Sequence, residues 1–428
     1  MNKENKRKGK HLIRTILPVL AAGILITGII FSHFGGFGTG PCADMNEFAK
    51  YSAPISEISI PEETRIIALG EATHGNAEFQ QLKLDVFKIM VEKFGVRAFA
   101  LEGDFGSCEA VNRYIHGADG SAAEAAASIG FAIYRTREMA DLIEWMRTYN
   151  RSAAEGDDIR FYGFDMQRQE YNYKFLAESV RKFGISGDDL DKLWDEEKNE
   201  FSDVYDPDQR AGILESVRQE LARTDDPEAA MAVRFAEILL QNISLGKVIN
   251  DPGTGNAMRD RLMAENTLWI LEQEEKRNNS RIFISGHNGH LEQFGSYGAD
   301  AKVMGNLLAD ELGDAYFVIG TDFYKTRCNL PTGKGEKRTV RSFYSYDMLA
   351  KASKESGFDM SWLDFSQIPD DSALKGQVSE YMWMGSLEEY YDPLLMLIPP
   401  LSYRIWRSPA ALFDGMIFVT EAHPTNIR

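Results

Sequence analysis

Short apolar runs alternate with longer amphipathic segments along most of the chain. Each run has four to six residues, ends near a glycine or an acidic residue, and has the character of a buried strand. Five such runs are clear, and two further stretches near the C-terminus are strand-like. They are residues 65–69, 97–101, 159–164, 282–285 and 316–320, followed by 395–398 and 416–419.

The segment between the first two runs predicts a helix. Apolar residues recur from Phe79 to Phe94 at the three- and four-residue spacing of one helix face. Asn76 is a candidate N-cap and Gly95 a stop signal. A strand, a helix of about 18 residues and a second strand form a βαβ unit, so the two strands should be parallel with a right-handed crossover.

Further helical patterns predict an α/β fold. Helices are expected at 108–116, 122–128 and 137–149, and residues 170–277 contain helical patterns with almost no strand signal. Alternating strands and helices favour a mostly parallel sheet with helices on both faces. Residues 170–277 are interpreted as a helical insertion into a domain that covers 45–428.

The N-terminal 35 residues differ from the rest. Six Lys and Arg residues and one Glu precede or border an apolar stretch, 15–32, that contains no charged residue. Such a stretch can span a bilayer, and its basic flank should stay in the cytoplasm. We therefore expect a membrane anchor in residues 1–35, a Gly-rich linker at 36–44, and an extracytoplasmic domain. A cleaved signal peptide, which would give a secreted protein, is the alternative.

Charge and cysteine content narrow the classes of partner and site. The net charge is −18, and the chain beyond the basic N-terminus is more acidic still, which argues against a nucleic-acid partner. Three cysteines without a Cys-x-x-Cys pair exclude a cysteine zinc site. Cys108 and Cys328 are a possible disulfide outside the membrane.

Polar residues capable of chemistry follow the predicted strands at their carboxyl ends, where open α/β sheets place their sites. Only seven histidines occur, and three of them fall at these strand ends. We therefore expect one polar cleft, with its reactive groups within roughly 10 Å of one another. Its candidate residues, in chain order, are Glu71, His74, Glu102, Asp165, His287 and His290.

His74 is the candidate general base. An imidazole titrates near neutral pH, and a carboxylate three residues away, Glu71, can orient it and fix its tautomer. His287 and His290 could serve as proton donor, oxyanion stabiliser or metal ligand. Asn288 between them is expected to shape the loop by bonding to backbone.

Four further residues have weaker signals. Asp165 could be a site residue or a structural hydrogen-bond acceptor. Lys83, Arg259 and Asp260 could support the site, although surface charges or ion-pair partners are slightly favoured. The sequence lacks a Gly-x-Ser-x-Gly elbow, a phosphate-binding Gly-x-x-x-x-Gly-Lys loop and a His-Glu-x-x-His motif. Serine hydrolysis, nucleotide binding and the commonest zinc-peptidase scheme are therefore disfavoured.

An ordered set of motifs resembles the erythromycin esterase family. The resemblance runs from about residue 45 to the C-terminus. The matching segments are Gly-Glu-Ala-Thr-His-Gly at 70–75, Leu-Glu-Gly at 101–103, Thr-Arg-Glu at 136–138, Trp-Met-Arg-Thr-Tyr-Asn at 145–150, Gly-Phe-Asp at 163–165, Met-Arg-Asp at 258–260, Met-Ala-Glu-Asn at 263–266, Gly-His-Asn-Gly-His at 286–290 and Phe-Asp-Gly-Met-Ile-Phe at 413–418.

This resemblance implies a Rossmann-like core with a helical subdomain, and hydrolysis of a macrolactone ester, the chemistry of macrolide resistance, without a required metal. The histidine matching His74 would activate water, and carboxylates matching Glu71 and Glu102 would support it. His287 and His290 would complete the cleft. Family esterases often have arginine where Lys83 aligns, and lysine lacks the bidentate fork of a guanidinium. The expected partner is a small-molecule ester or macrolide.

Two alternatives remain open on the sequence. One is a metal-dependent hydrolase in which His74, Glu102, His287 and His290 bind Zn²⁺ or Mn²⁺ and generate hydroxide. The other is a non-enzymatic envelope protein whose cleft binds a ligand unchanged.

Overall fold

The computed structural model describes residues 18–27, 42–226, 228–297, 301–331, 337–345, 347–387 and 403–427. Residues 18–27 are helical, while the rest of the predicted 15–32 anchor and the strand-like stretch 395–398 lie outside these ranges. Among the described helices, none combines the length and the apolar character needed to cross a bilayer.

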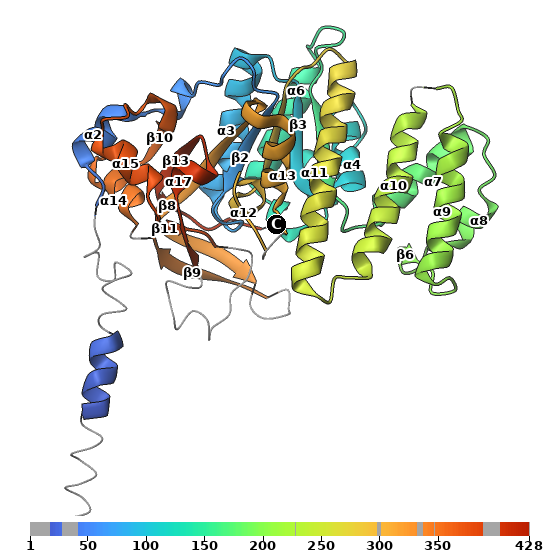
Figure 1. Cartoon of the computed structure of the whole chain (residues 1–428). Helices are drawn as coiled ribbons and strands as arrows, with labels where there is room; N and C mark the ends of the chain where they lie inside the picture. Colours follow the sequence, from blue (N-terminus) through green and yellow to red (C-terminus); the bar gives the residue numbers. More distant parts are fainter. Residues whose placement is uncertain are drawn as a thin grey trace, which may run out of the picture.

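A nine-stranded sheet forms the centre of the described chain (Figure 1). The strand order is β1-β10-β13-β8-β2-β7-β3-β4, with β9 paired to β8. The six strands from β13 to β4 are mutually parallel, whereas β1, β10 and β9 pair in antiparallel fashion. The prediction of a mostly parallel α/β sheet is therefore confirmed. Along the sheet the strands are β1 Ser52–Ala53, β10 Met360–Asp364, β13 Gly415–Ala422, β8 Tyr316–Pro331, β2 Ile66–Glu71, β7 Ile282–His287, β3 Ala98–Asp104, β4 Arg160–Asp165 and β9 Arg338–Tyr344.

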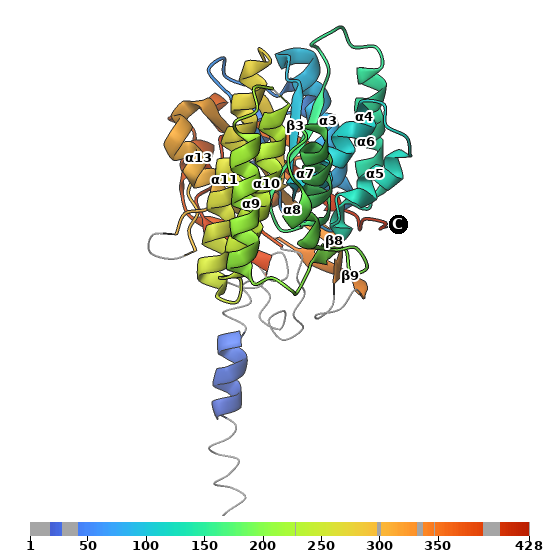
Figure 2. The ribbon, with the colours of Figure 1, turned by 90° about the vertical axis from the view of Figure 1, so that its right-hand side faces the viewer.

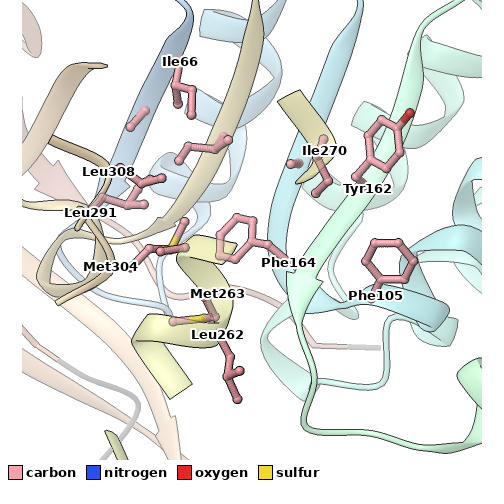
Figure 3. Close-up of a cluster of buried hydrophobic side chains, with 14 of the residues drawn as sticks. Ile66, Phe105, Tyr162, Phe164, Leu262, Met263, Ile270, Leu291, Met304 and Leu308 are labelled. Atoms are coloured by element: carbon pink, nitrogen blue, oxygen red, sulfur yellow. The ribbon is translucent and has the colours of Figure 1, made fainter. Parts of the chain in front are cut away.

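Alternating side chains of the central strands enter two hydrophobic clusters. In β2, Ile66 and Ala68 belong to one cluster and Ile67 and Leu69 to the other, because successive residues of a strand point to opposite faces. Helices α11 (Pro252–Lys276) and α13 (Met304–Leu312) cover the first face, which contains Phe164 and Met263 (Figure 3). Helices α3 (Ala77–Phe94) and α6 (Arg137–Asn150) cover the second. Helices therefore lie on both faces, as predicted.

Of the two end signals predicted for α3, the stop at Gly95 is confirmed and the cap at Asn76 is wrong. Gly95 ends α3 in the left-handed conformation at φ 68°, and Thr136 caps α6 by accepting a bond from the Met139 amide. The Asn76 side chain does not cap α3. It bonds instead to the Arg327 and His423 carbonyls and to the Thr326 hydroxyl, so tertiary contacts determine its orientation.

Residues 170–277 form mainly helices, which pack beside the sheet (Figure 2). A two-stranded hairpin, β5–β6, interrupts them. Side chains of α7, α9 and α10 share one hydrophobic cluster with α11 and with the sheet, so the insertion is continuous with the main core. Its elements are α7 Glu170–Lys182, α8 Asp188–Lys192, β5 Trp194–Asp195, β6 Glu200–Phe201, α9 Pro207–Leu221, α10 Ala229–Gly246 and α11.

Several elements have no counterpart in the predictions. Strand β8 continues far beyond the predicted stretch 316–320 to pair with β9, and a hairpin of β11 and β12 follows later in the chain. Helices α4 Phe105–Ile115 and α5 Ala122–Ser128, by contrast, correspond to the helices predicted at 108–116 and 122–128. The remaining elements are α2 Met45–Tyr51, η2 Ile55–Glu57, η3 Ala132–Tyr134, α12 Asn288–Leu291, η4 Gly313–Ala315, α14 Met348–Glu355, η5 Phe365–Gln367, α15 Ala373–Ser379, β11 Met382–Gly385, β12 Arg404–Arg407 and α17 Pro409–Leu412.

Cys108 and Cys328 are buried and not bonded to each other, so the possible disulfide does not form. Cys108 lies in α4 and Cys328 in the long extension of β8. The Cys328 sulfur instead forms a hydrogen bond with the Thr73 hydroxyl, at a distance of 2.9 Å.

Candidate active site

The carboxyl ends of four parallel strands meet at one cavity of about 430 Å³. Glu71 ends β2, Asp165 ends β4 and His287 ends β7, while Glu102 lies in the last half of β3. Helix α11 adds Arg259, and the short helix α12 adds His290. The cavity lining includes His74, Glu102, Asp165, Arg259, His287 and His290.

Glu71 connects His74 to a buried lysine. His74 Nδ1 lies 2.9 Å from Glu71 Oε1, and Lys83 Nζ donates to Glu71 Oε2 at 2.7 Å. The Gln80 amide also donates to Oε2, at 3.2 Å. Lys83 is fully buried in α3, so the interpretation as a surface charge is wrong. It neutralises the carboxylate behind the candidate base.

The charge on Glu71 fixes the tautomer of His74. Burial alone would raise the pKa of this carboxyl, but Lys83 and His74 outweigh burial and lower the pKa to about 2. Glu71 is therefore a carboxylate at neutral pH and accepts a hydrogen bond from a nitrogen that carries a proton. His74 Nδ1 carries that proton, which leaves the basic lone pair of the neutral ring on Nε2.

His287 is a neutral donor beside His74. Its Nδ1 accepts a bond from the Gly289 amide at 3.2 Å, so Nε2 carries the ring proton. Burial, together with the charges of His74 and His290, lowers the pKa of His287 to about 3. Nε2 is buried and has no hydrogen-bond partner in the described part of the chain. The ring centroids of His74 and His287 are 5.1 Å apart.

Arg259 joins two carboxylates across the cavity. Its Nη2 donates to Glu102 at 2.8 Å and to Asp165 at 2.7 Å. The other Glu102 oxygen accepts the His287 amide at 2.8 Å. Burial works against the charge of Glu102, but His290 and Arg259 hold its pKa well below the usual range. Glu102 is therefore fixed as an anion, and the Arg259 guanidinium joins it to the Asp165 carboxyl group.

His290 stands between two acidic groups. Its Nδ1 lies 2.7 Å from Asp260 Oδ1, and its Nε2 lies 3.4 Å from Glu102 Oε1. Burial opposes a charged ring, yet Asp260 and Glu102 raise the pKa of His290. Asp260 is buried and also accepts the Met304 amide and the Tyr297 hydroxyl. Arg259 Nη1, which can only donate, lies 3.1 Å from Nε2, and the Arg259 charge lowers the pKa. The pKa of His290 is therefore raised while that of His287 is lowered, and His290 Nε2 faces the guanidinium.

Asn288 holds the histidine loop against the sheet. Its amide donates to the Thr321 carbonyl and accepts the Thr321 amide, so it bonds to backbone as predicted. A Cβ on Gly70 would lie 2.1 Å from Asn288 Oδ1, which explains why glycine stands there. Gly70 does not have a positive φ, so close packing, rather than a special backbone conformation, requires glycine at this position.

The structure places the predicted residues in two layers. Four of the five candidate catalytic residues line the cavity, and Glu71 lies directly behind His74. Among the supporting candidates, Asp165 and Arg259 also line it. Asp260 contacts the lining residue His290, Lys83 contacts Glu71 behind His74, and Asn288 follows His287 in the histidine loop. Arg259 and Asp260 are therefore not surface charges. The wall also contains polar residues that were not predicted, among them Glu292, Tyr297, Ser386 and Arg407.

The donor set does not fit a metal ion. A zinc or manganese site needs at least three of His74, Glu102, His287 and His290 to converge. Among the residues that the structure describes, no group of three or more His, Cys, Asp or Glu side chains could hold a metal. The positive charge beside Glu102 and Asp165 belongs to the Arg259 guanidinium.

Comparisons with known proteins agree with the fold. The family model described as erythromycin esterase matches residues 91–422. Erythromycin esterase type II of Escherichia coli is 24% identical over 300 residues, which are 61% of this chain and 70% of that protein. The crystal structure of a succinoglycan biosynthesis protein superimposes with a TM-score of 0.73 at 19% identity and covers 90% of this chain and 98% of that one. A mutant of the erythromycin esterase EreC in its open conformation gives a TM-score of 0.53 at 15% identity, with coverages of 90% and 96%. At these identities the two structures show the fold alone.

Proposed function

This chain belongs to the erythromycin esterase family, and we propose that it is an ester hydrolase in which His74 activates water against an ester or macrolactone carbonyl. Membership of the family supports hydrolase chemistry. The observation that carries the proposal is the chain of contacts from Lys83 through Glu71 to His74, which leaves a basic nitrogen on a ring that lines the cavity.

In the proposed reaction, His74 Nε2 takes a proton from water as the water oxygen bonds to the carbonyl carbon. Glu71 stabilises the imidazolium that forms, because it is already an anion 2.9 Å from Nδ1. The carbonyl oxygen becomes an oxyanion. The neutral His287 ring, with a buried and unpaired Nε2–H in the described structure, is suited to donate to it.

Arg259, Glu102, Asp165 and His290 supply a fixed charged wall opposite the base. Because each of these groups already has a charged partner, the wall does not reorganise as charge develops on the substrate. A guanidinium, two carboxyl groups and an imidazole in contact also make the cavity strongly polar, which suits an ester with several oxygen atoms better than a purely apolar one.

A panel of esters with a macrolide included tests the activity and the substrate separately. Purified protein incubated with erythromycin should yield a product heavier by one water, detected by mass spectrometry. Turnover of simple esters without macrolide cleavage would keep the hydrolase and refute the macrolide. No turnover of any ester would refute the hydrolase and favour a ligand-binding role.

Chelation tests the role of a metal independently. We expect activity to survive dialysis against EDTA, because the positive charge beside Glu102 and Asp165 comes from Arg259. Loss of activity with EDTA and recovery with Zn²⁺ or Mn²⁺ would contradict this expectation.

The N-terminal segment is proposed to anchor the domain outside the membrane. The support is the uncharged stretch 15–32 behind a basic flank. Membrane fractions washed with alkaline carbonate should retain the full chain. A shortened protein in the medium would instead indicate a cleaved signal peptide.

A further inference from the structure

Glu292 is a buried carboxyl group of the cavity whose surroundings differ from those of Glu71 and Glu102. It follows α12, and its backbone amide bonds to the Asn288 carbonyl at 2.9 Å, so the histidine loop fixes its position. Its side chain lines the same cavity as His74 and His287 and is only 7% exposed. No hydrogen bond or ion pair to the carboxyl oxygens occurs among the described residues, unlike those that hold Glu71 and Glu102.

Space for this carboxyl depends on a neighbouring glycine. A Cβ on Gly295 would lie 2.4 Å from Glu292 Oε1, so any other residue at 295 would displace the side chain. Behind it, a Cβ on Gly305 would come within 2.6 Å of the Glu292 carbonyl oxygen, so α13 packs closely against this backbone. The packing keeps the carboxyl at the cavity wall without satisfying it.

The environment of Glu292 favours its protonated form. Burial raises its pKa to about 8, and the opposing charges of Arg407 and His290 do not overcome burial. Glu71, by contrast, has a pKa of about 2. One cavity therefore combines a carboxylate that supports a base with a carboxyl that keeps its proton at neutral pH, the separation that acid and base roles require.

Ester cleavage needs a proton donor when the leaving alcohol is a poor leaving group. His287 donates to the oxyanion in the proposed reaction, and the proton on His74 comes from the attacking water. We propose that Glu292 is the general acid of this site, a role that rests on the proposed hydrolase function. As the tetrahedral intermediate collapses, the bond between carbon and the leaving oxygen breaks, and that oxygen takes the Glu292 proton. The carboxylate then regains a proton from solvent, and His74 releases the proton of the attacking water.

Two esters of one acid separate this role from a structural one. Ethyl butyrate releases an alkoxide that needs protonation, whereas 4-nitrophenyl butyrate releases a stabilised phenolate that does not. In Glu292→Gln we expect kcat for the ethyl ester to fall by about 10²- to 10⁴-fold. The rate for the nitrophenyl ester should stay close to that of the wild type, which also shows that the variant is folded.

The pH profile gives a second readout. Wild-type hydrolysis of the ethyl ester should decline above pH about 8, where Glu292 loses its proton, and the nitrophenyl ester should lack this decline. Glu292→Asp, which keeps a carboxyl on a shorter stem, should restore part of the ethyl-ester rate and the alkaline decline. Glu109→Gln is the matched control, because burial also raises the pKa of Glu109 but it lies on α4, outside the cavity lining.

Each outcome decides the matter. Equal losses on both esters, or no loss on either, in a folded Glu292→Gln protein would overturn the role of general acid and leave the hydrolase intact. If Glu292→Gln does not fold, the wild-type pH profiles decide, and an alkaline decline that is absent for the ethyl ester or shared by both esters would overturn the role. A wild type that hydrolyses neither ester would overturn the proposed function itself.

Discussion

Replacing Lys83 with Met removes the charge that keeps Glu71 ionised. Burial raises the pKa of Glu71, and Lys83 is the largest of the influences that bring it down to about 2. The difference from the ordinary glutamate pKa of 4.5 corresponds to about 3 kcal/mol in favour of the carboxylate, at about 1.4 kcal/mol per pKa unit. Without Lys83, burial dominates and the pKa of Glu71 should rise above 4.5.

Catalysis and stability should both respond. The ionised form of Glu71 is favoured by about 3 kcal/mol, and it stabilises the His74 imidazolium in the transition state. If the substitution removes between half and all of this stabilisation, kcat/KM at pH 7 should fall by roughly 10- to 100-fold. The acid limb of the pH profile should move upward. Breaking a buried ion pair should also lower the free energy of unfolding by about 3–5 kcal/mol.

The sign of the pH dependence can be checked by urea unfolding. The folded pKa of Glu71 is depressed, so its stabilisation is present above the unfolded pKa and is lost as pH falls toward 2. The difference in stability between wild type and Lys83→Met should therefore be large at pH 7 and shrink below pH about 4.5.

Lys88→Met is the matched control. It removes the same charge from the same helix, but Lys88 lies over the Trp145 ring and not in the cavity lining. Lys83→Arg should keep the wild-type acid limb, because the charge remains, even if packing suffers. Wild-type kcat/KM and an unchanged acid limb in folded Lys83→Met would refute the reasoning.

Two other substitutions test the frame of the site. Gly70→Ala should lower the free energy of unfolding by about 1–3 kcal/mol and reduce kcat, because its Cβ would displace Asn288 from Thr321. Gly212→Ala is the control, since no atom lies within 4 Å of the new Cβ, and it should change neither the stability nor kcat. Urea unfolding and ester turnover measure both effects, and equal behaviour of the two variants would contradict the packing role. Asp322→Asn should remove part of the decline of stability with rising pH. Burial and Asp347 raise the pKa of Asp322, so the stability that its proton confers is present below the unfolded pKa and is lost as pH rises through the folded pKa. Urea unfolding over a series of pH values upward from about 4 measures this change, and the prediction fails if the variant keeps the wild-type pH dependence.

The sequence predicted those parts of the molecule that depend on local pattern. Buried parallel strands appear as short apolar runs, and the residues at their carboxyl ends converge because the strands share a direction. His74, Glu102 and His287 were found in this way. The contact between Glu71 and His74 was also accessible, because three residues separate them in one loop.

Other features depend on contacts that are remote in the chain. The extension of β8 is paired with β9, and β12 pairs with β11 across 388–402, so neither follows from its own periodicity. Lys83 lies in a helix, and its sequence context does not distinguish it from a surface lysine. Its burial becomes evident only when the structure places it against Glu71. Glu292 had a weak signal, as an acid two residues after His290, but its burial depends on α13 and on Gly295.

The central claim is that His74 activates water. The most direct test is the turnover of His74→Ala on an ester that the wild type hydrolyses, with circular dichroism to verify the fold. We predict that hydrolysis falls to the uncatalysed rate while the spectrum is unchanged, because no other ring in the cavity combines a basic nitrogen with the Glu71 contact. Hydrolysis at the wild-type rate by folded His74→Ala protein would contradict the claim.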